Sequence, residues 1–193
     1  MAILGAFFDA NVLYPSGLRN FLMHLALTGI FRAHWSAEVH DEWIRNLLKN
    51  RPDITRDKLE RTRRLMDQAA PDALVTGYES LIDSLELPDR DDRHVLAAAI
   101  RCGASVIVTL NLSDFPNAAL AEFGIEAQHP DDFVLSLTET FPEFVLEAAR
   151  THRASLRNPS KTRDEYLAEL NTQELCRSAA ALRELIAGQD SII

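Results

Sequence analysis

Residues 3–11 read Ile-Leu-Gly-Ala-Phe-Phe-Asp-Ala-Asn, an apolar run that ends abruptly in an acid. Strands that are buried on both faces are continuously apolar, so the run over residues 3–8 predicts a central strand of a parallel sheet. Placing Asp9 at the end of such a strand removes water from its carboxylate, which is costly unless that group is hydrogen-bonded or bound to a cation. Asp9 is therefore either a turn or cap residue or a metal ligand.

The chain up to about residue 135 alternates between strand-like and helix-like segments. Ser36 is a typical N-cap and Gly103 a typical C′ residue, and these two positions bound predicted helices. The alternation predicts an α/β fold, a three-layer α/β/α sandwich with a central parallel sheet. Further short strands are expected at residues 34–36, 73–75, 106–109 and 125–128, with helices at about 18–26, 37–49, 54–69, 94–103 and 117–123.

The pattern changes from Phe141 onward, where helical periodicity continues without any strand signal. Helices are expected at about residues 142–153, 162–171 and 173–187, with a break at Asn158-Pro159-Ser160. We therefore expect an α/β domain over residues 1–138 and a C-terminal helical extension over residues 139–193.

Composition narrows the function classes. Hydrophobic residues make up 47% and charged residues 25% of the 193 residues, which is ordinary for a globular protein. The formal net charge of −9 argues against a protein that coats nucleic acid by bulk electrostatics, although it permits local contacts through metal ions and a few arginines. No apolar segment is long enough to cross a membrane, and no basic leader precedes the first strand, so a cytoplasmic protein is expected. The separated Cys102 and Cys176 are expected to be incidental thiols.

Three further acids are candidates to join Asp9, because ligands of open α/β sheets gather at the carboxyl ends of the strands. Asp114 lies in the loop after the strand at 106–109, and Asp92 begins the helix that leads into that strand. Glu42 borders the apolar face of the helix at 37–49, where Glu38 is its rival for the same role. Each acid also has an ordinary interpretation as a turn, helix-start or surface residue.

Polar residues accompany the acids at the strand ends. Asn11 follows Asp9 by two positions, and Asn111 precedes Asp114 by three. Both amides could position acids or substrate through hydrogen bonds, and Thr109 is a weaker candidate for the same task. Carboxylate oxygens are the ligands of hard divalent cations, so the set predicts a site for Mg²⁺ or Mn²⁺.

Several segments together resemble the PIN domain family, and within it the VapC-type toxins of bacterial toxin–antitoxin pairs. The resemblance spans about residues 3–135. It is carried by FFDANVLYP from residue 7, SAEVHDEW from residue 36, DDRHVLAAAI from residue 91 and VIVTLNLSDFPNAALAEFGIEAQHPDDF from residue 106.

The resemblance implies a metal-dependent endoribonuclease that cleaves single-stranded or structured RNA, with an antitoxin protein as partner and a homodimer as assembly. By position, Asp9, Asp92 and Asp114 match metal-binding acids, and Glu42 matches the helical glutamate that orients or deprotonates the attacking water. Asn111 stands where some members have aspartate, so the contact of the fourth acid with metal could be indirect.

Basic residues gather in two segments, and the sequence does not decide what either segment binds. Arg61 and Arg64 belong to a charged helix with Arg56, Lys58 and Arg63, which is either a solvated face or a groove for the RNA backbone. The C-terminal segment is equally undecided between RNA and an acidic partner; its basic residues are Arg150, His152, Arg153, Arg157, Lys161 and Arg163.

Two alternative functions are kept. A strand ending in aspartate also opens the haloacid-dehalogenase-like phosphatases, but Asn11 stands where that family expects an acid, and lysines are few. The other alternative is a PIN fold that has lost catalysis and serves as a binding module, which would predict missing acids.

Overall fold

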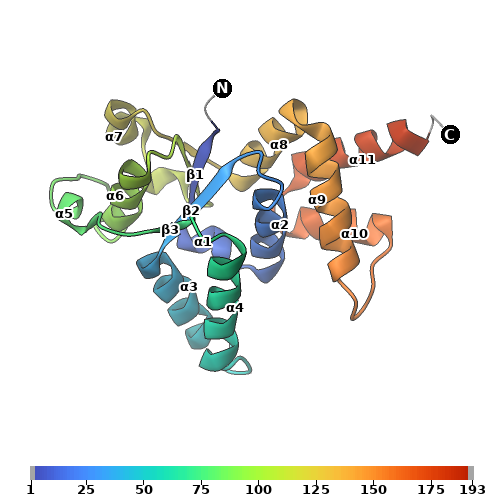
Figure 1. Ribbon diagram of the computed structural model, residues 1–193, viewed down its shortest axis with the longest axis horizontal. Coiled ribbons are helices and arrows are strands. Elements are labelled where there is room, and N and C mark those ends of the chain that lie inside the picture. The colour runs from blue at the N-terminus through green and yellow to red at the C-terminus, as the bar shows by residue number, and fades with distance from the viewer. Residues whose placement is uncertain (1–2, 191–193) are drawn as a thin grey trace. The chain divides into compact units, whose positions relative to one another are not determined.

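The computed structural model describes residues 3–190, and side chains as far as residue 188 (Figure 1). The chain forms two compact units. The sheet unit takes the residues up to Tyr14 together with Phe31–His129, and the helical unit takes Pro15–Ile30 together with the residues from Pro130 onward. The expected boundary between residues 138 and 139 falls inside the helix Pro130–Thr140.

The sheet unit is built on five parallel strands in the order β3-β2-β1-β4-β5 (Figure 1). The strands are β1 (Gly5–Phe8), β2 (Arg32–Ser36), β3 (Leu74–Val75), β4 (Val106–Val108) and β5 (Glu126–Gln128). The order reverses at β1, because β2 and β3 lie on one side of it and β4 and β5 on the other. The carboxyl ends of β1 and β4 therefore form the topological switch point, where ligands of such sheets bind.

Helices flank the sheet and confirm the predicted α/β/α fold class. The longer ones are α3 (Ala37–Asn50), α4 (Arg56–Ala69) and α6 (Arg93–Cys102). Short turns of helix complete the unit: α1 (Ala10–Leu13), α5 (Glu79–Ile82), η1 (Leu112–Asp114), α7 (Asn117–Leu120) and η2 (Ala121–Phe123). As predicted, Ser36 caps α3 by accepting a hydrogen bond from the backbone N–H of Val39, and Gly103 ends α6 with a left-handed φ of +68°.

Large aromatic side chains fill the interior of the sheet unit. Phe8, Trp35 and Trp43 are fully buried. The indole N–H of Trp35 donates to Asp67 of α4 over 2.9 Å, so its polar edge has a partner. The alanines at positions 97–99 of α6 are also fully buried. Their small side chains let α6 lie close to the strands that it contacts.

The helical unit consists of α2 (Ser16–Ala26), α8 (Pro130–Thr140), α9 (Pro142–Ser155), α10 (Arg163–Thr172) and α11 (Cys176–Asp190). The carboxylate of Asp131 caps α11 by accepting from the backbone N–H groups of Arg177 (2.9 Å) and Ser178 (2.8 Å). The side chain of Gln173 accepts from the backbone N–H of Leu18 over 3.2 Å and ties α2 to the C-terminal helices. Within the described residues, no helix is long and apolar enough to cross a membrane.

The buried Phe8 tests the core of the sheet unit. Phe8→Ala should lower the free energy of unfolding by about 3–5 kcal/mol, because it leaves a cavity between β1 and its neighbours. Leu65→Ala on α4 is the matched control, since Leu65 is 53% exposed and its loss should cost less than about 1 kcal/mol. Urea denaturation followed by circular dichroism measures both, and equal effects would contradict the core assignment.

The buried His152 predicts how the stability depends on pH. Its Nδ1 lies 2.9 Å from the hydroxyl of Tyr166, and burial, helped by the nearby His24, lowers its pKa from 6.5 to about 4. The unfolded chain takes up a proton near pH 6.5 while the folded protein resists it. The free energy of unfolding should therefore fall by about 1–3 kcal/mol as the pH drops from 6.5 to 4.

His152→Gln keeps an acceptor for Tyr166 and removes the titration. In this variant the fall in the free energy of unfolding between pH 6.5 and pH 4 should be smaller by about 1–3 kcal/mol. Denaturation curves measured across the same pH range test this. An unchanged pH dependence would show that other groups cause it.

Candidate metal centre

Asp9 directly follows β1 and is 4% exposed. Its backbone N–H donates to the carbonyl of Val108 at the end of β4 over 3.1 Å. One carboxylate oxygen accepts from the N–H of Ala10 (2.6 Å), and the other accepts from the amide of Asn11 (2.6 Å) and the hydroxyl of Thr109 (2.7 Å). These partners hold the carboxylate at the switch point, where Asp9 is the N-cap of α1.

Asn11 and Thr109 link the ends of β1 and β4. The amide N–H₂ of Asn11 also donates to the hydroxyl of Thr109 over 2.9 Å, and its carbonyl accepts from the backbone N–H of Leu110 over 3.0 Å. Thr109 is fully buried, and its hydroxyl accepts in addition from the backbone N–H of Asn111. The side chains expected to position acids thus do contact Asp9, and Thr109 contacts it as directly as Asn11 does.

Asp92 stands at the start of α6 without capping it, because its side chain makes no hydrogen bond to the first turn. The neighbouring acids have ordinary roles by comparison. Asp89 and Asp91 are both exposed, and the Asp89 carboxylate accepts from the backbone N–H of Asp91 over 2.9 Å. Of this acidic cluster only Asp92 is partly withdrawn from solvent.

Glu42 is distinguished from its rival Glu38 by burial and by neighbours. The side chain of Glu42 is 30% exposed, whereas that of Glu38 is 54% exposed. Glu42 also contributes to the electrostatic environment of both Asp9 and Asp92. Glu42 therefore fits the acid site better.

His94 joins the two glutamates and was not singled out by its sequence pattern. It is buried, with Nε2 lying 3.6 Å from a Glu42 oxygen and Nδ1 3.8 Å from a Glu38 oxygen. Burial alone would lower its pKa, but the glutamates raise the pKa of His94 above its ordinary value. The only signal in the sequence is its place two residues after Asp92 on the same helix.

Asp114 ends η1 and is partly exposed. The side-chain amide of Asn111 donates to its carboxylate, and Ser113 donates to Asn111 over 2.9 Å. The buried Phe115 anchors this turn in the core. Asn111 is therefore hydrogen-bonded to Asp114, and a positioning role for it stays a prediction.

The acids repel one another electrostatically. Burial raises the pKa of Asp9 to about 6, with repulsion from Glu42 adding to the rise and the Thr109 hydrogen bond opposing it. Burial also raises the pKa of Asp92 to about 7, and carboxylates add to this effect in the order Asp9, Asp114, Asp89 and Glu42. The fold thus brings all four predicted acids into one electrostatic cluster.

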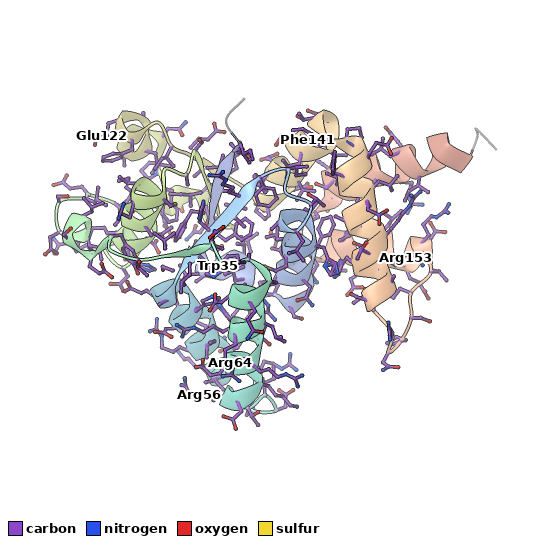
Figure 2. All side chains as sticks on the ribbon, viewed as in Figure 1. Trp35, Arg56, Arg64, Glu122, Phe141 and Arg153 are labelled. Carbon is purple, nitrogen blue, oxygen red and sulfur yellow. The ribbon has the colours of Figure 1, made fainter. Side chains whose placement is uncertain are left out.

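A cleft of about 720 Å³ opens beside this cluster. Glu42, Asp92 and His94 line it, and so do two basic residues that sequence reasoning missed, Arg45 and Arg90. Arg61 and Arg64 do not line it, and both are exposed on α4. Figure 2 labels Arg64 on this helix. The basic segment from Arg150 to Arg163 belongs to the helical unit.

The donor chemistry suits a hard divalent cation. Carboxylate oxygens are the ligands that Mg²⁺ and Mn²⁺ prefer. Burial is the main cause of the raised pKa values of Asp9 and Asp92, and a cation would offset the repulsion that adds to it. Between residues 3 and 188, no three His, Cys, Asp or Glu side chains are grouped closely enough to hold a metal ion as they stand.

The parallel sheet with a buried aspartate after its central strand, joined by acids from α3, α6 and the loop after β4, is the arrangement of a PIN domain. The PIN domain model matches residues 6–113, and the VapC50 C-terminal domain model matches residues 130–184. The chain belongs to the PIN domain family and is a VapC-type member with a C-terminal extension.

One curated relative is a protein of Mycobacterium tuberculosis (strain ATCC 25618 / H37Rv) named "Putative ribonuclease VapC50". It is 47% identical over 79 residues, which cover 39% of this chain and 46% of that protein. The alignment thus spans about half the length of the relative. No solved structure matches the chain.

Substitution of Asp92 tests the acid cluster without an assay of nuclease activity. With a chelator present, Asp92→Asn should raise the free energy of unfolding at pH 8 by about 1 kcal/mol, because it removes a half-buried, repelled charge that solvent partly screens. The gain should vanish as the pH falls from about 7 towards 4, since folded Asp92 is already protonated there. Millimolar Mn²⁺ should stabilise the wild type and leave the variant unchanged.

Asp91→Asn is the matched control, because Asp91 is an exposed neighbour in the same loop. Its substitution should change neither the free energy of unfolding nor the stabilisation by Mn²⁺. Chemical denaturation with and without Mn²⁺ gives both readouts. A destabilised Asp92→Asn protein at pH 8 would contradict the repulsion argument.

Proposed function

We propose that this protein is a metal-dependent endoribonuclease that cleaves single-stranded or structured RNA, and that it acts as the toxin of a type II toxin–antitoxin pair. The electrostatic effect of Asp9, Asp114 and Glu42 on Asp92, four acids that come from separate elements, is the observation that supports the proposal most. Membership of the PIN domain family and the relative named as a ribonuclease support it.

Asp9, Asp92 and Asp114 would hold one or two cations directly or through water. PIN-domain nucleases generally use divalent metals, and Mg²⁺ or Mn²⁺ fits an all-oxygen ligand set. Such a cation lowers the pKa of bound water and offsets negative charge on the phosphoryl group. Asp9 supplies a ligand that Asn11, Thr109 and the backbone hold in one orientation.

Glu42 would orient or deprotonate the attacking water. It lies on the cleft, only partly exposed, and His94 beside it restrains its carboxylate on the side that faces α6. Asn111 would keep Asp114 directed to the same site through its hydrogen bond. Substrate would enter along the cleft, where Arg45 and Arg90 could contact phosphates. Arg61 and Arg64 on α4 remain proposed contacts for more distant parts of the RNA.

The partners follow from the proposed role. A VapC-type toxin has RNA as its substrate and an antitoxin protein as its cognate partner, and we propose a homodimer in the cytoplasm for this chain. We also propose residues 1–138 as the nuclease domain and residues 139–193 as the helical extension.

Cleavage of a labelled single-stranded RNA tests the nuclease activity. The wild type should cut in Mn²⁺ or Mg²⁺ and stop when a chelator is added. Asp9→Asn and Asp92→Asn should each lower kcat/KM by about a hundredfold or more, because a metal ligand is lost. Asp91→Asn should retain activity. Glu42→Gln should lower kcat, whereas Glu38→Gln should have a much smaller effect.

The wild type and the same variants also distinguish the nuclease from the two alternative functions. Turnover of small phosphate esters without RNA cleavage would favour the phosphatase. Binding of RNA with no cleavage in either metal would favour a non-catalytic PIN module. Growth arrest on expression should disappear in Asp9→Asn, and equal toxicity of both proteins would refute the catalytic assignment.

A further inference from the structure

The helical unit carries an open groove of about 550 Å³ that is lined by the end of α8, the start of α9 and the second half of α11. Pro142, Ala181 and Leu185 supply its apolar walls. Thr138 also lines it, and its hydroxyl is already used, because it donates to the backbone carbonyl of Val134 over 2.7 Å. The groove can therefore take an aliphatic side chain.

Three glutamates, one from each helix, also line the groove: Glu139, Glu143 and Glu184. All three are exposed. Among the side chains that the structure describes, no Lys or Arg lines the groove, and none of the three carboxylates forms a hydrogen bond or an ion pair. The apolar groove is thus bordered by negative charge that this unit does not neutralise.

The lining restricts what the groove can bind. Its negative charge repels the phosphates of nucleic acids and of lipids. A wholly apolar partner would remove water from the carboxylates without pairing them, which costs free energy. An aliphatic side chain flanked by arginines avoids both effects, because arginine stems pack on apolar surface while the guanidinium groups bind carboxylates. The groove therefore suits a basic helix face that contains an aliphatic residue.

Helix α4 of the sheet unit carries such a face. Arg61, Arg64 and Leu65 are three and four residues apart, so they are neighbours on the helix surface. Both arginines are exposed, and Leu65 is 53% exposed. Within the described part of the chain neither arginine forms a hydrogen bond or an ion pair, whereas Arg63 on the same helix pairs with Asp41 over 2.8 Å. The basic face of α4 is therefore as unpartnered as the acidic groove.

We propose that the basic face of α4 in one copy of this protein docks in the acidic groove of a second copy. Leu65 packs against the apolar walls, and Arg61 and Arg64 pair with the glutamates. One helix face is a small contact, so association in the micromolar range is expected. Reciprocal exchange of the contact between two copies would close the assembly as the homodimer proposed above. The interface rests on that homodimer and not on nuclease activity, because it uses none of the acid cluster.

Sedimentation velocity of the full-length chain, without RNA, measures the association. The wild type should self-associate at low ionic strength. Raising NaCl from about 0.05 M to about 0.5 M should weaken this association, because salt screens exposed charge pairs. A wild type that stays monomeric at low salt and high protein concentration would overturn the proposal, and cleavage of RNA by that monomer would leave the nuclease function intact.

Charge reversal tests each side of the contact. One protein carries Glu139→Lys with Glu184→Lys in the groove, and another carries Arg61→Glu with Arg64→Glu on α4. Each alone should self-associate at least about tenfold more weakly than the wild type, because attraction becomes repulsion. All four residues are exposed, and circular dichroism checks that both proteins are folded. Association that neither reversal weakens would overturn the proposal.

A mixture of the two reversed proteins identifies the partner surfaces. It should associate about as tightly as the wild type, because each protein keeps or gains the surface that the other needs. Glu86→Lys with Glu122→Lys is the control, since these exposed glutamates of the sheet unit give the same change in net charge as the groove variant and should leave association unchanged. No gain on mixing would overturn the proposal. An α4 variant that sediments like the wild type but binds single-stranded RNA more weakly would assign Arg61 and Arg64 to RNA instead.

Discussion

The arrangement of the sheet unit depends on one buried carboxylate at the end of its central strand. Asp9 accepts hydrogen bonds from Ala10, Asn11 and Thr109, and its own N–H pairs with the end of β4. These bonds join the carboxyl ends of β1 and β4 and determine where the following loops begin. The sheet reverses its order at β1, and Glu42 on α3 and Asp114 on η1 act electrostatically on Asp92, which precedes α6. The geometry of the proposed active centre follows from how Asp9 is buried.

The burial of Asp9 lowers the stability of the folded chain and serves the proposed metal centre. Without a cation, Asp9 and Asp92 lie among other carboxylates in a partly dehydrated site, and their pKa values rise to about 6 and 7. A well-packed protein with no use for these charges would gain stability from neutral side chains at the same positions. Charge repulsion that a bound cation relieves is the physical reason to interpret the cluster as a metal centre. His94 fits the same account, because its ring lies between two glutamates that would otherwise repel each other.

Much of this could be predicted from the sequence because the signals are local. The apolar run before Asp9, the cap at Ser36 and the glycine after α6 each depend on a few neighbouring residues, and all three are confirmed. The choice between Glu42 and Glu38 depends on how α3 is rotated against the sheet, which periodicity does not determine. His94 could not be assigned, since its partners come from a helix far earlier in the chain. Helix α8 was missed because Pro130–Thr140 directly follows the last strand and was not separated from it.

The most direct test of the central claim is the position of a bound cation. Crystals of the protein grown or soaked with Mn²⁺ should give an anomalous difference peak at about 2.0–2.4 Å from carboxylate oxygens of Asp9 or Asp92, with Asp114 in contact directly or through water. The peak should be absent from crystals of Asp92→Asn treated in the same way. A fully occupied Mn²⁺ site elsewhere, with none at these acids, would contradict the account.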